Sequence, residues 1–94
     1  MFEKAVVKKI REFIDRATSL GLPQPDRENA VEFLSYNEWG LAFDLVAAQL
    51  FDHGIEIDSE FLRLAREIQK EMHLDEREYA YLDELLKKGS YLGD

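Results

Sequence analysis

The sequence predicts an all-α fold, a single small bundle of four to five helices joined by short turns, on three observations. Apolar residues recur at three- and four-residue spacing along most of the chain, and single Gly or Pro residues interrupt this pattern at intervals. Only residues 55–57 alternate as a strand would, and they have no second strand to pair with. The chain of 94 residues has the length of one domain, residues 1–94, with one modest core.

The first two helices are predicted from an apolar stripe and from the residues that interrupt it. The stripe runs over residues 2–20 and stops at Gly21, which favours a helix of that length. Residues 22–25 include two prolines and are expected to be non-helical. Asp26 is then the predicted N-cap of a short second helix that ends close to Tyr36.

A third helix is predicted over residues 37–53, ending at Gly54. Two caps compete for its start: a capping box of Ser35 and Glu38, and Asn37 alone. Its apolar face is widened by a second row of residues, Leu41, Leu45 and Ala48. This width indicates that the third helix lies at the centre of the fold.

The connector that follows is expected to be extended, with both of its Ile side chains in the core. Asp58 or Ser59 is predicted to cap a fourth helix, whose apolar face runs from Phe61 to Met72. The fourth helix carries its charged residues on the opposite face, as an amphipathic surface helix does.

A fifth helix is predicted to begin at a capping box formed by Asp75 and Glu78. Its apolar residues continue at helical spacing to a break at Gly89. Residues 89–94 are therefore expected to form a tail that frays unless its own apolar residues dock.

The charge of the chain excludes several classes of partner. There are 20 acidic against 12 basic residues, giving a net charge of −8. Nucleic acids and anionic membranes bind Lys and Arg, so neither is expected as a direct partner. The chain contains no Cys, no secretory signal and no apolar stretch long enough to span a membrane, and we expect a cytoplasmic protein.

Residues suited to catalysis or metal binding are few. His53 and His73 are the only histidines, and each falls in the last turn of a predicted helix, where imidazole complements the helix dipole. The spacing of Asp52, His53, Glu56 and Asp58 matches neither an EF-hand loop nor the two-His helix motif of zinc sites. We therefore expect neither an enzyme nor a bound metal or cofactor. A small enzyme is the third hypothesis for the function, after the two binding functions given below.

The negative charge is concentrated in the middle third of the chain. Residues 25–60 hold nine acidic residues and one basic residue, Arg27. About half of these acids fall in predicted first helical turns, where carboxylates complement the dipole. Asp44, Asp52 and Glu56 are not explained in this way. They predict a negative face suited to a basic partner such as the active-site surface of a nuclease.

One stretch of the chain is similar to a known family. Residues 33–44 read FLSYNEWGLAFD and are followed by Leu45, Leu50 and the segment GIEI at residues 54–57. Together with the next helix, over roughly residues 28–72, this pattern resembles the MafI family of immunity proteins. These small bacterial proteins are encoded beside polymorphic or contact-dependent growth-inhibition toxins. The resemblance names no catalytic residue, and the matching Gly40, Leu41 and Ala42 are interpreted as packing residues.

The resemblance implies a function in which the chain binds and neutralises a cognate secreted toxin. The expected partner is the C-terminal domain of that toxin, a basic nuclease, often an RNase of EndoU-like or other fold, held in a one-to-one complex. The residues expected at the interface are Tyr36, Glu38, Trp39, Asp44, Asp52, Glu56 and Asp58. Occupation of the active site and binding beside it are both compatible with this hypothesis. The alternative is a helical adaptor or homo-oligomer subunit without a toxin partner.

Overall fold

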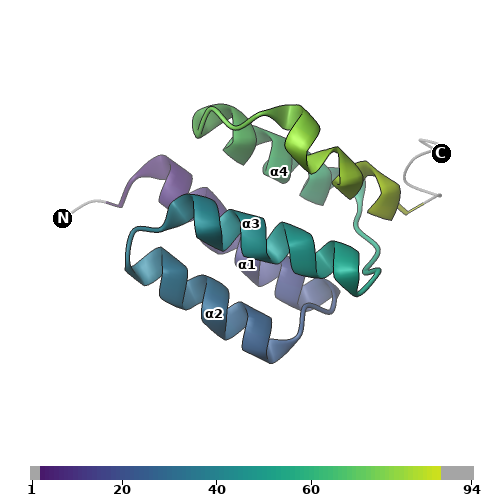
Figure 1. Ribbon diagram of the computed structural model, residues 1–94, viewed down its shortest axis with the longest axis horizontal. Coiled ribbons are helices and arrows are strands. Elements are labelled where there is room, and N and C mark those ends of the chain that lie inside the picture. Colours follow the sequence, from purple (N-terminus) through teal and green to yellow (C-terminus); the bar gives the residue numbers. More distant parts are fainter. Residues whose placement is uncertain (1–2, 88–94) are drawn as a thin grey trace.

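The computed structural model describes residues 3–87 and confirms the all-α fold. Those residues form four α-helices and one 3₁₀-helix (Figure 1). Their bounds are α1 (Ala5–Leu20), α2 (Gln24–Ser35), α3 (Trp39–Asp52), α4 (Ser59–Glu71) and η1 (Glu76–Leu85). The predicted tail, residues 89–94, lies outside the described residues.

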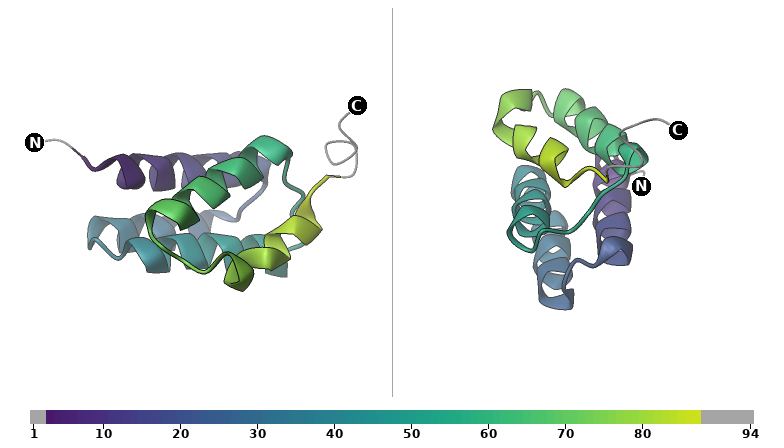
Figure 2. Two further views of the ribbon diagram at one scale, coloured as in Figure 1. Left: turned by 90° about the horizontal axis from the view of Figure 1, so that it is seen from above. Right: turned by 90° about the vertical axis from the view of Figure 1, so that its right-hand side faces the viewer.

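The helices are arranged as a three-helix unit covered by a pair. Helices α1, α2 and α3 pack against one another, and α4 and η1 lie across one side of this unit. Viewed end-on, α4 lies above α1 and η1 lies above α3, with α2 on the far side (Figure 2). Helix α3 therefore contacts α1, α2 and η1 and keeps one long side free of other helices.

A row of aromatic rings joins the two parts of the fold. Phe13 of α1 stacks between Phe43 of α3 and Phe61 of α4, with centroid distances of 4.8 Å to each. Tyr79 of η1 meets Phe43 edge-on at 5.0 Å. The three Phe side chains are almost completely buried. Aromatic pairs of this geometry add stability beyond their buried area, so this row holds four helices in register.

Two helices begin at residues other than those predicted. Helix α1 starts at Ala5, with extended Lys4 as its N-cap, rather than at residue 2. Helix α2 starts at Gln24, so Pro25 lies inside its first turn and Asp26 is not the cap. A proline is compatible with the first turn because the N–H that it lacks has no intrahelical partner there.

The turn between α2 and α3 shows that neither predicted cap is correct. Ser35 Oγ donates to the carbonyl of Glu32, 2.7 Å away, and does not reach α3. Asn37 adopts a φ of 62°, and the next N–H, that of Glu38, donates to the carbonyl of Phe33 at 2.9 Å. This is the hydrogen bond of a Schellman-type helix end, in which Asn is one of the residues that tolerate the left-handed conformation. Asn37 therefore ends α2 instead of beginning α3.

The connector between α3 and α4 is extended, as predicted, and it pairs with the chain that follows η1. Ile57 is buried, and its N–H donates to the carbonyl of Leu85 at 2.9 Å. Its carbonyl accepts from the N–H of Lys87 at 2.8 Å, forming an isolated parallel bridge between Ile57 and Leu86. The pairing involves a single residue on each side, so it is a bridge and not a strand of ordinary length.

The last helix has the predicted N-cap residue, Asp75, but differs from its prediction in type and length. It is a 3₁₀-helix with a kink at Tyr79, and it ends at Leu85 rather than at Gly89. Asp75 caps the helix through the N–H of Arg77, 2.9 Å away, and not through Glu78 as the predicted capping box requires; it also pairs with the Arg77 guanidinium. The helix ends early because the residues after Leu85 are bound to Ile57.

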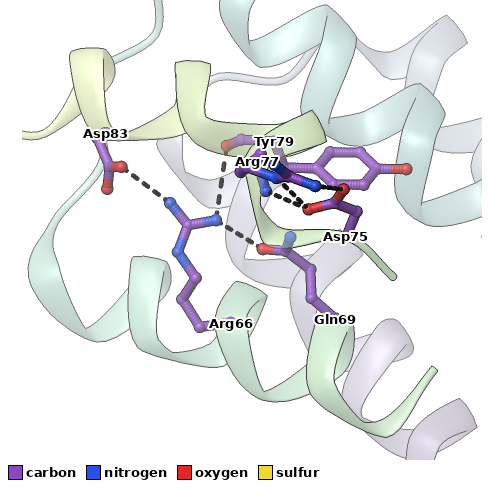
Figure 3. A network of polar contacts seen from close by, with 6 residues as sticks. All are labelled: Arg66, Gln69, Asp75, Arg77, Tyr79 and Asp83. Carbon is purple, nitrogen blue, oxygen red and sulfur yellow. Dashed lines mark hydrogen bonds and ion pairs between the residues drawn. The ribbon is translucent and has the colours of Figure 1, made fainter. Parts of the chain in front are cut away.

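A polar network fixes η1 on α4 (Figure 3). The guanidinium of Arg66 donates to Gln69 Oε1 at 2.6 Å and to Asp83 Oδ2 at 3.0 Å. A longer contact of 3.5 Å joins it to the backbone carbonyl of Tyr79. One half-buried Arg thus contacts η1 both at its kink and near its C-terminal end.

Replacing Gly40 by Ala tests whether this residue is needed for close helix packing, as the sequence pattern indicated. A Cβ built there would lie 3.8 Å from the flexible end of Met72, which is ordinary van der Waals contact. Because Ala has the higher helix propensity, we expect Gly40→Ala to raise the free energy of unfolding by about 0.5 to 1 kcal/mol in urea titrations. Gly54→Ala is the contrasting variant: its φ of 60° predicts a loss of about 1 kcal/mol. A destabilised Gly40→Ala would contradict the open packing seen around this position.

Candidate interaction surface

The side of α3 opposite its buried residues combines apolar and acidic side chains, and η1 borders it along one edge. We call it the outer face of α3, and it consists of Leu41, Asp44, Ala48, Phe51 and Asp52. Leu41 is 48% exposed and Phe51 is 41% exposed, so both large apolar side chains are open to solvent. Five other residues of the helix form its buried side: Ala42, Phe43, Val46, Ala47 and Leu50.

This arrangement corrects the role predicted for the second apolar row of α3. Leu45 and Ala48 are half-buried and Leu41 is exposed, so the row borders solvent instead of widening the core. Among the residues that carry the family resemblance, Ala42 is fully buried, whereas Gly40 and Leu41 are not core residues. Apolar residues therefore lie on two opposite sides of α3.

Two tyrosines of η1 extend the outer face. The ring of Tyr81 meets that of Phe51 edge-on at a centroid distance of 5.1 Å. The hydroxyl of Tyr79 donates to Asp44 Oδ1 at 3.2 Å. Burial, followed by the charge of Asp44, raises the pKa of each tyrosine to about 12, and Asp52 contributes further at Tyr81. Both hydroxyls therefore stay protonated at neutral pH, and both carboxylates lie near Tyr81.

Most carboxylates around α3 form no ion pair with a Lys or Arg of the described residues. Ion pairs between the described residues join α1 to α4 through Lys9 and Glu71, α4 to η1 through Arg66 and Asp83, and α2 to α1 through Arg27 and Asp15. In residues 3–87, no Lys or Arg nitrogen lies within 4.0 Å of the carboxylates of Glu38, Asp44, Asp52 or Glu56.

The two aromatic residues predicted as anchors occupy different environments. Tyr36 is 70% exposed at the C-cap of α2, and Glu38 is exposed at the start of α3. Trp39 is half-buried against the core, and Lys4 Nζ lies 5.0 Å from its ring centroid. Its indole N–H is buried and has no acceptor within the described residues. Trp39 thus packs mainly with the fold, whereas Tyr36 is available to a partner.

Glu56 and Asp58 lie beyond the end of α3, and Asp58, unlike Glu56, caps the next helix. Glu56 is exposed in the connector. Asp58 is the N-cap of α4, as predicted, since its Oδ1 accepts from the N–H of Phe61 at 2.8 Å. The carboxylate of Asp58 therefore contributes to helix stability whatever else it binds.

The residues that sequence reasoning missed are those that complete the outer face. Leu41 was interpreted as a packing residue, and Phe51 and Tyr81 were not selected for the interface. A signal for two of them exists in the sequence: Leu41, Ala48 and Phe51 recur at helical spacing on the side opposite Ala42 and Val46. The contribution of Tyr81 carries no such signal, because it comes from a helix 30 residues away.

Both histidines lie on the surface. His53 Nε2 is 3.7 Å from Asp26 Oδ2, which links the ends of α2 and α3. His73 borders a surface hollow of about 680 Å³ between α4 and η1, lined also by Arg66 and Lys70. Within residues 3–87 no three His, Asp or Glu side chains are grouped so that they could hold a metal ion. Of the described helices, none combines the length and the apolar character needed to cross a membrane.

Comparison with known proteins assigns no family to the chain. No protein-family model matches it, and neither does any curated protein or solved structure. Function is therefore inferred from the chain's own residues and their geometry.

Asp58 offers a test that separates a structural carboxylate from a free one. Asp58→Ala removes the cap and is expected to lower the free energy of unfolding by about 1 kcal/mol in urea titrations. Asp58→Asn keeps a capping oxygen and should lose little, although it removes the same charge. Glu56→Ala, at an exposed position without a capping role, is the matched control. Equal losses in Asp58→Ala and Asp58→Asn would show that charge, and not the cap, is what stabilises α4.

The raised pKa values of Tyr79 and Tyr81 predict that the free energy of unfolding falls at alkaline pH. The pKa of each is raised from the ordinary 10.0 to about 12, so between these values the folded chain keeps protons that the unfolded chain releases. The stabilisation is complete below pH 10 and is lost as the pH rises toward 12. Absorbance at 295 nm should show two late-ionising tyrosines, and Tyr81→Phe should remove one of them and flatten the fall of stability over this range. Late ionisation that is unchanged in Tyr81→Phe would contradict the assignment.

Proposed function

We propose that this chain is an immunity protein of the MafI type, which binds a cognate secreted toxin one-to-one in the cytoplasm and blocks it. The toxin is a ribonuclease with a basic active-site cleft, and the chain itself catalyses nothing. The single observation that carries the proposal is the outer face of α3, where exposed apolar side chains lie among carboxylates that pair with no Lys or Arg of residues 3–87. The resemblance at residues 33–57 supports the same function.

The physical chemistry of this face favours binding over folding as its role. Exposed Leu41 and Phe51 leave apolar area in water, which contributes little to the stability of the isolated chain. Like charges at Asp44 and Asp52 repel each other weakly and also contribute nothing to folding. Both features become favourable when a partner covers the apolar side chains and supplies cations.

A ribonuclease fits the charge of this surface. The enzyme must attract phosphate, so its cleft is lined by Lys or Arg, and an acidic domain competes for that cleft with the RNA substrate. Opposite charges on the two proteins also accelerate their encounter, which suits an inhibitor that must act before RNA is cleaved.

The rival function, a homo-oligomer subunit, is less well supported by the same face. In a two-fold symmetric dimer each patch meets its own copy, so Asp44 and Asp52 would face equally charged carboxylates. An adaptor that binds an unrelated basic protein is compatible with the face, and the identity of the partner distinguishes it. An immunity gene lies directly after the gene of its toxin.

Reversal of charge tests the acidic surface. We expect Asp44→Lys, Asp52→Lys and Glu56→Lys together to slow association with the toxin domain about tenfold or more at low salt, because exposed charges act on the encounter rate. The salt dependence of the association rate should disappear in this variant. Stopped-flow or surface-plasmon measurements at several salt concentrations provide the rates.

The matched control reverses three exposed carboxylates of η1, Glu76, Glu78 and Glu84, which changes the net charge by the same amount. A smaller effect in this control shows that the location of the charge matters and not only its sum. The biological test is co-expression with the toxin domain of the preceding gene. If cells die equally with and without this chain, and no complex elutes in size exclusion, the proposed function is wrong.

A further inference from the structure

We infer that the outer face of α3 docks against a concave basic protein surface, with an arginine side chain of the partner lying over the Phe51–Tyr81 ring pair between Asp44 and Asp52. The inference rests on the proposed function only for the biological source of that partner. It names the part of the chain that is contacted, the kind of side chain that contacts it, and the shape of the opposing surface.

The geometry supplies an aromatic floor with carboxylates beside it. The rings of Phe51 and Tyr81 meet edge-on at 5.1 Å, and Phe51 is 41% exposed, so part of this pair is open to a ligand. Asp44 and Asp52 are exposed on the same face. Eight residues separate them along α3, which places their backbone positions about 12 Å apart at 1.5 Å per residue.

One of these carboxylates is held in place before any partner arrives. The Tyr79 hydroxyl donates to Asp44 Oδ1 at 3.2 Å, and no contact within the described residues occupies the second oxygen. The ring of Tyr79 is itself fixed by its contact with Phe43 in the core. A carboxylate that is already oriented loses less conformational entropy when it binds a cation.

Arginine fits this surface better than lysine. Its guanidinium is planar, so it stacks on an aromatic ring and still donates hydrogen bonds to a carboxylate at its edge. It is also less strongly hydrated than an ammonium group, so it enters an apolar contact at a lower desolvation cost. Lysine would satisfy the charge but would not match the combination of ring and carboxylate.

The opposing surface must be concave. Leu41 and Phe51 project from one helix and lie about 15 Å apart along its axis, ten residues at 1.5 Å each. Three surface hollows of the chain lie elsewhere: between α1 and α4, between α4 and η1, and beside the connector. Apolar side chains on a helix bind by entering recesses of a partner, and a cleft walled by Lys and Arg provides both the recess and the complementary charge.

A titration with N-acetyl-arginine amide, followed by NMR on the full chain, tests the arginine contact without the toxin. We expect shifts concentrated at the Phe51 and Tyr81 rings and at the amides of Asp44 and Asp52. N-acetyl-citrulline amide, which has the same shape without the charge, should give no such shifts, and N-acetyl-lysine amide should bind at least threefold more weakly. Shifts spread evenly over all exposed carboxylates, or equal binding of the lysine and arginine compounds, would overturn the inference.

Variants of single residues complete the test. Asp52→Asn and Phe51→Ala should each weaken binding of the arginine compound at least threefold. The matched controls are Glu32→Gln and Val31→Ala, at exposed positions of α2 outside the face. In a complex with the toxin domain, Phe51→Ala and Leu41→Ala should raise the dissociation rate about tenfold, while Val31→Ala changes it less than twofold. Leu41→Ala leaves the Phe51–Tyr81 contact intact, so it reports on docking even if Phe51→Ala lowers stability.

The outcomes for the face and for the toxin are separable. Protection of cells by the wild-type chain, combined with no localised arginine binding, rejects the inference and leaves the proposed function in place. Localised arginine binding without protection from the toxin supports the inference and rejects the proposed function.

Discussion

The contact on which the rest of the structure depends is the stacking of Phe13 between Phe43 and Phe61. These rings join α1, α3 and α4 at centroid distances of 4.8 Å, and Tyr79 adds η1 to the row. The row does not end in the core, because the hydroxyl of Tyr79 reaches Asp44 on the outer face of α3. Tyrosine is suited to this position, since its ring packs with apolar residues while its hydroxyl binds a polar group at the edge. The orientation of a surface carboxylate is thus coupled to the packing of the core.

The distribution of charge separates the part of the molecule that stabilises the fold from the part available to a partner. Lys9 of α1 pairs with Glu71 of α4, and Arg66 of α4 pairs with Asp83 of η1, so these basic residues are used within the fold. Helix α3 has no Lys or Arg in its sequence. Its carboxylates therefore have no basic partner within the helix itself. The exposed ion pairs elsewhere in the fold each contribute at most about 1 kcal/mol to stability. The location of the basic residues, more than the number of acidic ones, makes this face negative.

The fold could be predicted from sequence where the information is local, and it could not where the information comes from a distant segment. The apolar spacing of α1 and α4 and the Asp58 cap are local, and they were predicted correctly. Asn37 was misassigned because the same residue type suits the start of one helix and the left-handed end of another. The bridge between Ile57 and Leu86 depends on two residues far apart in sequence, so no local pattern announces it. For the candidate surface, Asp44 and Asp52 were identified from charge, but α3 is apolar on two sides, and periodicity alone does not tell which side is buried.

In the proposed complex the carboxylates of the outer face have a second role, because they disfavour contact of Leu41 and Phe51 with a second copy of the chain. Exposed apolar patches promote association of identical chains, and a symmetric contact through this face would place Asp44 and Asp52 opposite their own copies. In the low dielectric of an interface such a repulsion costs more than it does in water, because solvent no longer screens it. A basic partner reverses the sign of this interaction at the same positions. In the proposed complex, the carboxylates that disfavour a homodimer are also the groups that select a cationic surface, and the apolar side chains between them supply contact area once the charges match.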